Sequence, residues 1–445
     1  MKILFINPPS PDGYIYIRDI NRSGRRSRER TIWPQVSLAM LAAMFPEHEV
    51  DIWDCIADGL SHDDVFQKLV NWRPDWVIVE SVSCTFESDM TVVKDAKALG
   101  AKVAVISPHS EALREETLKR FPEIDHLIDY EKFQTNGTTI KEPEAHLREV
   151  ITGLPCGTSF SDLPIARQDL LPRERYNLPL IGRGYTFVIT SRGCPWTCIY
   201  CRQGVTWKNR VRYRRADSIV EEIQRFKLNN VAFHADTATV DKQRMLGICR
   251  LMPAGVRWIC NSRVDTVDPE MLHAMKQAGC WMICYGIESG NDRVLQMNEK
   301  GSHATVEQAR KAVRWTKEAG IQVWGYFMLG MFGDTVQTMG DTLKLALSVP
   351  VDIANFALAA PYPGTKWNEI AESNGWLSDT SWSAYDQNVS AIVDQPECSH
   401  QDVLRMQRRA YKKWYFSPRG LRFFARAYRP EYTRFFINVI REHLN

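Results

Sequence analysis

The stretch Tyr185-Thr-Phe-Val-Ile-Thr190-Ser-Arg-Gly-Cys194-Pro-Trp-Thr-Cys198-Ile-Tyr-Cys201 joins an apolar run to three closely spaced cysteines. The run Tyr185–Thr190 is typical of a buried strand, so the cysteines lie in the loop that follows the strand. Three thiolates at such short spacing can bind three corners of an iron–sulfur cube, and no fourth cysteine is near enough in sequence for the last iron. An iron without a protein ligand can bind a small molecule and react with it. The stretch therefore predicts a redox enzyme.

Two other interpretations of the three cysteines remain open. A structural zinc ion usually has four protein ligands, so Cys156, His234 or a more distant residue would have to supply the fourth. Free cysteines also cluster in cores, where they behave as small hydrophobic side chains. The Pro, Trp and Tyr residues between the cysteines favour the cluster.

The composition is that of an ordinary globular protein. The chain has 445 residues, 44% of them hydrophobic and 24% charged, which predicts two or three domains. No apolar stretch is long enough to span a membrane, and the N-terminus becomes polar too soon for a secretory signal. Eleven cysteines without secretion indicate a reducing compartment, and we expect a cytoplasmic protein. The net charge of +3 gives no global argument for nucleic-acid binding.

Short apolar runs alternate with helical patterns in residues 1–140. This alternation predicts a doubly wound, Rossmann-like parallel sheet with helices on both faces. Ligands of such folds bind beyond the carboxyl ends of the strands. The expected strands are Lys2–Ile6, Val50–Trp53, Trp76–Val79, Val103–Ile106 and His126–Ile128.

A second alternation begins after a predicted linker at 141–183 and covers residues 184–378. Its six strands and intervening helices predict a partial (β/α)6 barrel, similar to a TIM barrel, with its chemistry at the carboxyl ends of the strands. The cysteines follow the first strand and are therefore expected at the mouth of the barrel. The expected strands are Thr186–Thr190, Val231–His234, Arg257–Asn261, Trp281–Ile287, Val323–Leu329 and Ile353–Leu358.

A C-terminal helical segment is expected at 379–445. Aromatic and basic residues interleave from Tyr411 onward at helical spacing. We expect amphipathic helices that pack their aromatic rings on the barrel, while contact with a membrane surface or an acidic substrate is the alternative. The arginine run Arg22–Arg30 has two interpretations. It is either a solvated loop or a segment that binds a phosphate or carboxylate of the substrate.

These features resemble the radical S-adenosylmethionine enzymes, in which Cys-x-x-x-Cys-x-x-Cys follows the first strand of a six-unit barrel. The N-terminal domain is similar to the cobalamin-binding module that precedes the barrel in one large subclass, which includes methylases and anaerobic porphyrin cyclases. Four segments further resemble the barrel strand ends of that subclass. They are Asn261-Ser-Arg-Val-Asp265, Tyr285-Gly-Ile-Glu-Ser-Gly290, Phe327-Met-Leu-Gly330 and Pro361-Tyr-Pro-Gly-Thr365.

The resemblance implies that Cys194, Cys198 and Cys201 hold a 4Fe-4S cluster, and that S-adenosylmethionine chelates its open iron. It implies further contacts to S-adenosylmethionine from side chains near the strand ends. These are Tyr200 to the adenine, Asp236 to the amino group, Arg263 to the carboxylate, and Glu288 and Ser289 to the ribose hydroxyls. Helix capping by Asp236 and Glu288, or an ion pair between Arg263 and Asp265, is the structural alternative. His234, before the acidic position, departs from the residue types frequent in relatives and is expected at the barrel mouth.

Cobalamin is implied by the N-terminal module. Asp54-Cys-Ile-Ala-Asp-Gly59 keeps the spacing of the cobalamin motif Asp-x-His-x-x-Gly but has Ile56 in place of the cobalt-binding histidine. An apolar side chain below the corrin suits the subclass, whereas loss of cobalamin is the counter-interpretation. The further candidate contacts to cobalamin are Ser81, Ser83, Pro108 and His109.

The resemblance implies methyl transfer to an unactivated carbon, less often phosphorus, of a small molecule, through a 5′-deoxyadenosyl radical and methylcobalamin. It also implies an electron donor such as flavodoxin or ferredoxin. A radical cyclase or rearrangement enzyme of the porphyrin cyclase type is the enzymatic alternative. A cobalamin or iron–sulfur sensor and a tRNA-modifying enzyme are further alternatives, but the sequence has no DNA-reading motif and no dedicated RNA-binding module. The sequence does not identify the substrate.

Overall fold

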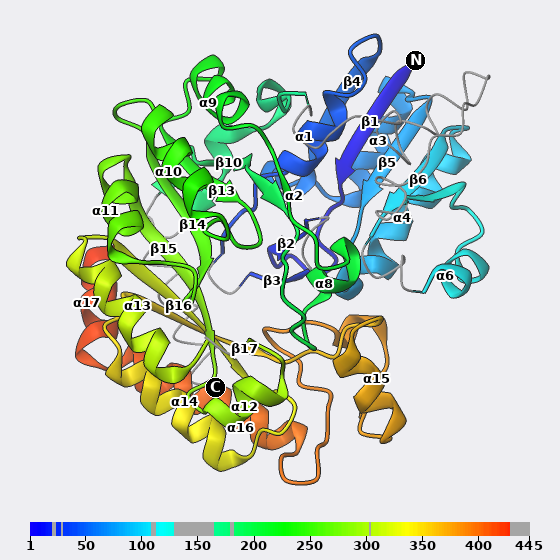
Figure 1. Cartoon of the computed structure of the whole chain (residues 1–445). Coiled ribbons are helices and arrows are strands. Elements are labelled where there is room, and N and C mark those ends of the chain that lie inside the picture. Colours follow the sequence, from blue (N-terminus) through cyan, green and yellow to red (C-terminus); the bar gives the residue numbers. More distant parts are fainter. Residues whose placement is uncertain are drawn as a thin grey trace.

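Two parallel sheets form the framework of the molecule (Figure 1). The computed structural model describes residues 1–19, 24–27, 30–107, 113–128, 164–178, 182–301 and 304–427. The five-stranded sheet comes from the N-terminal part, and the six-stranded sheet begins with the strand before the cysteines. The predicted α/β fold with two successive parallel sheets is confirmed.

The first sheet has the strand order β4-β1-β5-β6-β7, and all its neighbouring strands are parallel. Its chain order is therefore 2-1-3-4-5, the doubly wound order in which ligands bind where the connections diverge, here beyond β1 and β5. The bounds agree with the predicted runs to within a residue at most ends. They are β1 Lys2–Asn7, β4 Glu49–Asp54, β5 Trp76–Glu80, β6 Lys102–Ile106 and β7 His126–Ile128.

Alternate residues of β1 point into two different cores. Ile3 and Phe5 belong to a core that continues into the second sheet, whereas Leu4 and Ile6 pack with α3 and α4 on the other face. The short helix α1 packs on the first face, and it also contacts β10 of the second sheet. The two sheets thus share one continuous core. The helices and turns of this part are α1 Val36–Ala42, α2 Cys55–Asp58, α3 His62–Trp72, η1 Ser83–Thr85, α4 Phe86–Ala98 and α6 Arg114–Arg120.

The second sheet has the order β10-β13-β14-β15-β16-β17, with every strand parallel to its neighbours. Strands that are consecutive in the chain are adjacent in space, as expected of a partial barrel. Its strands are β10 Thr186–Ile189, β13 Asn230–His234, β14 Arg257–Arg263, β15 Cys280–Glu288, β16 Gln322–Leu329 and β17 Ile353–Leu358. The intervening helices are α8 Arg202–Trp207, α9 Ala216–Arg225, α10 Lys242–Leu251, α11 Pro269–Gln277, α12 Asp292–Met297, α13 Val306–Glu318 and α14 Val336–Ser348.

Of the C-terminal helices, α16 packs on the last barrel strands, β16 and β17, and α17 packs on α16. Tyr411 and Trp414 are buried, whereas Lys412 and Lys413 between them are exposed. The Tyr411 hydroxyl accepts a hydrogen bond from the Phe356 amide at 3.1 Å. In the part that ends at Ala427, the aromatic face therefore packs on the barrel. These elements are α15 Lys366–Ser373, η6 Trp382–Ala384, α16 His400–Tyr415 and α17 Pro418–Ala427.

Part of the predicted linker packs against both sheets. The Arg167 amide donates to the Ala39 carbonyl of α1, and Gln168 Nε2 donates to the Phe187 carbonyl of β10. The domain limits at 140, 183 and 378 remain predictions. The short elements are β2 Tyr16–Ile17, β3 Arg25–Arg26, η4 Gln168–Leu170, η5 Arg173–Arg175, β8 Asn177–Leu178, β9 Gly182–Arg183, β11 Ser191–Arg192 and β12 Arg212–Tyr213. No helix in the described ranges is long and apolar enough to cross a membrane.

A buried polar chain joins the two sheets. Arg192 Nη1 donates to His234 Nδ1 at 2.6 Å, and His234 Nε2 lies 2.7 Å from Asp19 Oδ2. A guanidinium group has no acceptor, so Nδ1 of His234 must accept, and Nε2 therefore carries the proton and donates to Asp19. All three side chains are buried. His234, expected at the barrel mouth, thus connects the barrel to the crossover after β1.

A second buried network holds the loops beyond β1 and β5. Arg18 is fully buried and forms an ion pair of 2.7 Å with Asp89. Its other hydrogen bonds go to the Asn7 side chain, the carbonyls of Pro8 and Pro9, and the Thr85 hydroxyl. Because these partners come from separate loops, the ion pair fixes the carboxyl edge of the first sheet.

We predict that Arg18→Met destabilises the protein strongly. Removing one partner of a buried ion pair leaves the other charge uncompensated, so we expect the free energy of unfolding to fall by about 3–5 kcal/mol. Burial already raises the pKa of Asp89 to about 6, and loss of Arg18 would raise it further. The folded state of the variant then binds a proton more tightly than the unfolded state. Its free energy of unfolding should therefore fall as the pH rises through about 6 and above. Urea unfolding across this pH range measures both effects.

Two variants serve as controls for this prediction. The double variant Arg18→Met with Asp89→Leu removes both charges and should regain much of the lost stability. Lys2→Met breaks the exposed pair between Lys2 and Glu49 and should change the free energy of unfolding by less than about 1 kcal/mol. An Arg18→Met protein as stable as the wild type would contradict the role given to this pair.

Candidate functional site

The cysteine loop, residues 194–201, lies between β11 and α8 at the carboxyl end of β10. Gly193 precedes it with φ of +87°, and a Cβ there would overlap the Arg210 carbonyl, so only glycine fits. The Gly193 amide donates to Asp236 Oδ2 at 2.7 Å, which ties the loop to the end of β13. On its other side, the Ile199 amide donates to the Asn298 carbonyl. The loop is therefore held at both ends.

The thiols are packed closely enough to affect one another. Burial, together with the neighbouring Cys198 and Cys194, raises the pKa of Cys201 to about 12. Burial likewise raises the pKa of Cys194. Arg263 Nη1 lies 3.8 Å from Cys198 Sγ. Metal binding requires thiolates, so iron bound here would have to offset the unfavourable ionisation.

The structure offers no ready site for a single metal ion in its described part. There, no group of three His, Cys, Asp or Glu side chains could surround one ion. An iron–sulfur cube makes a different demand, because each thiolate binds a different iron. Ligation of a cluster by the three cysteines remains a prediction.

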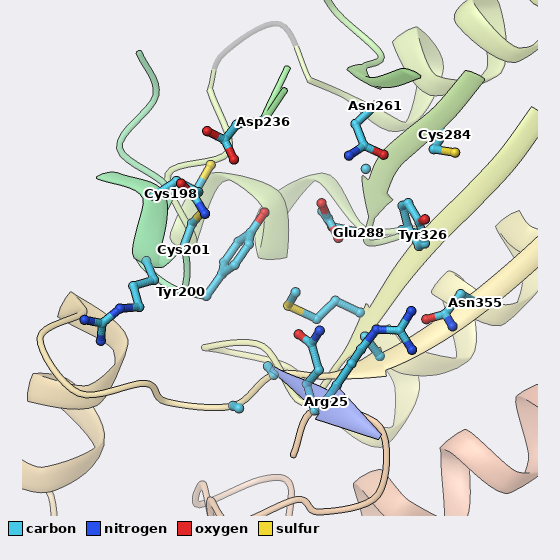
Figure 2. Close-up of a pocket in the computed structure, with 18 of the residues that line it drawn as sticks. Arg25, Cys198, Tyr200, Cys201, Asp236, Asn261, Cys284, Glu288, Tyr326 and Asn355 are labelled. Carbon is cyan, nitrogen blue, oxygen red and sulfur yellow. The ribbon is translucent and has the colours of Figure 1, made fainter. Parts of the chain in front are cut away.

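The cysteines open into a cavity of about 320 Å³ at the carboxyl ends of the barrel strands. Cys194, Cys198 and Cys201 line one end, and residues of β16 and β17 line the other (Figure 2). Trp33 and Arg25, from the crossover after β1, complete the wall. A cavity of this size is at the lower limit of the range of about 300–1,000 Å³ usual for small-molecule sites.

Four of the five side chains predicted to bind S-adenosylmethionine line this cavity: Tyr200, Asp236, Arg263 and Glu288. Figure 2 shows the Tyr200 ring between Cys201 and Glu288. The fifth, Ser289, is not among the lining residues, and its hydroxyl lies 3.3 Å from Thr342 Oγ1 of α14. The geometry thus brings four of the predicted residues together and directs Ser289 away from them.

Arg263 has several partners at once. Its Nε and Nη2 donate to the two carboxylate oxygens of Asp265, each at 2.9 Å. Its guanidinium lies 4.1 Å from the centre of the Trp196 ring, and it also donates to the Lys300 carbonyl. The predicted alternative, a pair with Asp265, is therefore present, while Nη1 still points at Cys198.

Lys300 is a site residue that sequence reasoning missed. It is 5% exposed and lines the cavity, where its Nζ donates to Glu288 Oε1 at 2.8 Å. Glu288 has φ of +66°, at an irregularity in the pairing of β15 with β16. A lysine in a polar loop between two helices is usually solvated, so the sequence contained no signal for this contact.

Tyr200 lines the cavity and has a buried hydroxyl group. Its oxygen has no hydrogen-bond partner among the described residues. Burial raises the pKa of Tyr200 well above its ordinary value, so the hydroxyl is a neutral donor and acceptor. A polar ligand in the cavity would satisfy it. Further lining residues are Asn261, Cys284, Tyr326 and Asn355, together with Arg25 from the run for which the sequence left a substrate contact open.

The residues predicted to bind cobalamin lie elsewhere. Ile56 is half-buried in α2, beyond the end of β4. The Ser81 hydroxyl donates to Asp89 at 2.7 Å, and Ser83 lies in the turn η1. Of the described residues Ile56, Ser81 and Ser83, none lines the cavity, and Pro108 and His109 lie outside the described residues. Their roles remain predictions.

Residues 188–346 match the family model of the radical SAM superfamily. The chain is 28% identical to an uncharacterized methyltransferase of Pyrococcus horikoshii, over 95% of this chain and 94% of that protein. It is 25% identical to the anaerobic magnesium-protoporphyrin IX monomethyl ester cyclase of Rubrivivax gelatinosus, over 82% of this chain and 68% of the cyclase.

Two solved structures share the fold. The cobalamin-dependent S-adenosylmethionine radical enzyme OxsB superimposes with a TM-score of 0.68 over 99% of this chain and 72% of that chain, at 14% identity. The radical S-adenosylmethionine methyltransferase TsrM of Kitasatospora setae superimposes with a TM-score of 0.61 over 85% and 79%, at 16% identity. The likeness covers both sheets of this chain.

We predict that Gly286→Ala disrupts the pair between Glu288 and Lys300. A Cβ at Gly286 would overlap Glu288 Oε1 and lie 3.2 Å from Lys300 Nζ. Because both side chains are buried and paired, we expect the free energy of unfolding to fall by roughly 1–3 kcal/mol.

Gly340→Ala is the matched control, since nothing lies within 4 Å of its Cβ position in α14. It should stabilise the protein by up to about 1 kcal/mol. Equal effects of the two substitutions in urea unfolding would contradict this account.

Proposed function

We propose that the protein is a cobalamin-dependent methyltransferase acting on a small molecule, and that residues 188–346, which match the family model of the radical SAM superfamily, form its radical S-adenosylmethionine domain. The observation that carries the proposal is one cavity at the barrel mouth, lined by the three cysteines together with Asp236, Arg263 and Glu288. The relative of Pyrococcus horikoshii, named a methyltransferase, aligns with nearly the whole chain and supports it.

We assign the three cysteines to a 4Fe-4S cluster and the adjoining part of the cavity to S-adenosylmethionine. Asp236 would accept from the ammonium group, and Arg263 Nη1, directed at Cys198, would contact the carboxylate. Tyr200 would pack on the adenine, and Lys300 would hold Glu288 toward the ribose hydroxyls. These side chains bind and orient a molecule that carries an ammonium, a carboxylate and a diol. The bound cofactors would supply the electron that cleaves S-adenosylmethionine, the resulting 5′-deoxyadenosyl radical and the methyl group on cobalamin.

We place cobalamin beyond the carboxyl edge of the first sheet. The crossover after β1 lies between this edge and the cavity, since Ile17, Arg25 and Trp33 line the cavity. Ile56 would meet the lower face of the corrin with an apolar side chain, and Ser81, Ser83, Pro108 and His109 would contact its periphery or its tail. The structures of OxsB and TsrM, solved with cobalamin bound, have the same fold and support this placement.

The remaining predictions complete the proposal. We propose a cobalamin domain at 1–140, a linker at 141–183, a barrel domain at 184–378 and a C-terminal segment at 379–445. We also propose a cytoplasmic location, because cluster chemistry requires reducing conditions, and an electron donor such as flavodoxin or ferredoxin. The size and lining of the cavity favour a small molecule over nucleic acid.

A radical cyclase is the second candidate. It is supported by the alignment with the porphyrin cyclase of Rubrivivax gelatinosus, which covers 82% of this chain. The cavity lining is common to both chemistries, because each begins with cleavage of S-adenosylmethionine. The products distinguish the two candidates.

We predict that Cys198→Ala abolishes the visible absorbance of the cluster after anaerobic reconstitution. The variant lacks one of three thiolates, so iron and sulfide content should fall in parallel with the absorbance. Cys249→Ala is the control, because this cysteine lies in α10 outside the cysteine loop. A wild-type spectrum for Cys198→Ala would refute the ligand assignment.

We predict that the reduced enzyme forms 5′-deoxyadenosine and S-adenosylhomocysteine together when its substrate is present. Methyl transfer through cobalamin consumes one S-adenosylmethionine for the radical and a second to remethylate the cobalt. Cyclisation would give 5′-deoxyadenosine without S-adenosylhomocysteine. Added cobalamin should also change the absorption spectrum of the purified protein, and an unchanged spectrum would remove the methyltransferase proposal.

A further inference from the structure

The end of the cavity away from the cysteines lies between β16, β17 and the hairpin β2–β3. Figure 2 shows Tyr326 and Asn355 on this side, with the Arg25 side chain extending toward Asn355. Asp236, Cys198 and Cys201 lie at the opposite end of the same view. The proposed cofactor contacts use the cysteine end, so this end can receive the substrate.

Strand alternation in the hairpin separates its two arginines. Arg25 and Arg26 are successive residues of β3, so their side chains leave on opposite faces. Arg26 donates to Asp12 Oδ2 at 2.8 Å and to the Tyr16 hydroxyl at 3.0 Å, away from the cavity. Arg25 lines the cavity. One guanidinium therefore stabilises the hairpin, and the other belongs to the cavity wall.

The hairpin is held firmly enough to fix Arg25. The Arg26 amide donates to Asp386 Oδ2 at 2.9 Å, and Asn388 Nδ2 donates to the Arg26 carbonyl at 2.6 Å. Gly24, with φ of +80°, packs against Val82, where a Cβ would overlap the valine side chain. These contacts join the hairpin both to the C-terminal segment and to the loop after β5. They place a guanidinium at a defined point of the wall.

The opposite wall offers neutral hydrogen-bonding groups. Tyr326 and Asn355 are paired residues of β16 and β17, and both line the cavity with Gln387. Their hydroxyl and amide groups can donate to an oxygen ligand. Among the described residues at this end, Arg25 is the charged side chain of the lining.

Most of the other charged lining residues belong to the cofactor end. Lys300 pairs with Glu288, and Arg263 pairs with Asp265. Asp236 accepts from the Gly193 amide, and Arg202 directly follows the cysteine loop. Asp386 lies close enough to Arg25 to interact with it electrostatically, but Asp386 is not a lining residue. Arg25 is the lining cation on the hairpin side of the substrate end, where Tyr326 and Asn355 also line the cavity.

We propose that this end of the cavity binds an anionic oxygen group of the substrate, a carboxylate or a phosphate, held by Arg25 and by Asn355. The inference rests on the proposed function, because it assigns the substrate end by exclusion of the cofactor end. Guanidinium groups bind both anions through paired hydrogen bonds. The hairpin would then select substrates by charge, while the neutral barrel wall accommodates the remainder of the molecule.

The test uses simple anions, since they report on the subsite directly. Protein reconstituted with its cluster and S-adenosylmethionine, without reductant, is titrated with inorganic phosphate or with succinate in separate calorimetric experiments. Chloride keeps the ionic strength constant. We expect saturable binding of at least one anion, and the preferred anion identifies the group. Loss of a hydrogen-bonded charge should weaken this binding by about 10- to 100-fold in Arg25→Gln.

Three further variants make the result specific. Arg25→Lys should retain part of the affinity, and Asn355→Leu should weaken it without changing the charge. Arg26→Gln, which makes the same charge change on the outer face of the hairpin, should bind the anion as the wild type does. Should Arg25→Gln fail to fold, Asn355→Leu decides alone. The inference is overturned if neither anion binds saturably, if Arg25→Gln and Asn355→Leu bind normally, or if Arg26→Gln weakens binding equally.

A separate measurement distinguishes this inference from the proposed function. Reduced wild-type protein and Arg26→Gln should both cleave S-adenosylmethionine to 5′-deoxyadenosine in the absence of substrate, because Arg26 makes its side-chain contacts on the outer face of the hairpin. Cleavage without any anion binding would overturn the anion subsite alone. Anion binding without cleavage would overturn the proposed function and leave the subsite in place.

Discussion

The buried chain Arg192–His234–Asp19 fixes the geometry of the whole site. Arg192 lies two residues before the first cysteine, and His234 lies two residues before Asp236. Asp19 lies two residues after β2, next to the buried Arg18. One series of hydrogen bonds therefore sets the positions of the cysteine loop, the end of β13 and the crossover from the first sheet. Because His234 Nδ1 must accept from Arg192, the proton of the neutral imidazole is on Nε2, which donates to Asp19. The imidazole thus forms a hydrogen bond with the buried guanidinium on one side and with the buried carboxylate on the other. The shared apolar core holds the two sheets together, and this hydrogen-bonded chain positions the loops of both sheets that border the cavity.

Charge compensation explains the remaining architecture of the cavity. Parallel strands direct polar residues at their carboxyl ends to one edge, and burying those residues is unfavourable unless each charge is paired. The pairs Glu288–Lys300 and Arg263–Asp265 meet this requirement. They also hold each side chain in a single orientation. The positive φ of Glu288 and the absence of a side chain at Gly286 are consequences of fitting such a pair into a strand end. The same pairs that make burial tolerable thus supply a preorganised polar wall.

The sequence predicted those parts of the molecule that depend on local pattern. Buried strands such as Lys2–Asn7 and Thr186–Ile189 are recognisable from their apolar runs, and the cysteine loop from its spacing alone. The start of a helix is harder to predict, since α4 begins at Phe86 whereas the helical periodicity of its sequence is clear only from Thr91. Lys300 could not be placed, because a charged residue in a loop is usually solvated and its burial depends on a partner distant in sequence. For Arg25, the run Arg22–Arg30 left both a solvated loop and a substrate contact open. Ser289 shows the converse, since its neighbour Glu288 turns into the cavity while its own hydroxyl faces α14.

The pairing of buried charges at the cavity also determines which part of the chain contacts which ligand in the proposed function. In the proposed function, the strand ends of β13, β14 and β15 are committed to one constant ligand, so their charged residues cannot be exchanged without losing it. The ends of β16 and β17 contribute the neutral groups of Tyr326 and Asn355, which discriminate weakly by charge. In the proposed subsite, the charge that distinguishes anionic from neutral substrates comes from Arg25. This residue lies on the hairpin β2–β3, whose strands have two residues each and which belongs to the crossover after β1. A short hairpin anchored by backbone contacts to residues 386 and 388 can change its inward side chain without disturbing either sheet. In the proposed function, the charge of the substrate is therefore recognised by the hairpin of the crossover, apart from the cofactor end of the barrel.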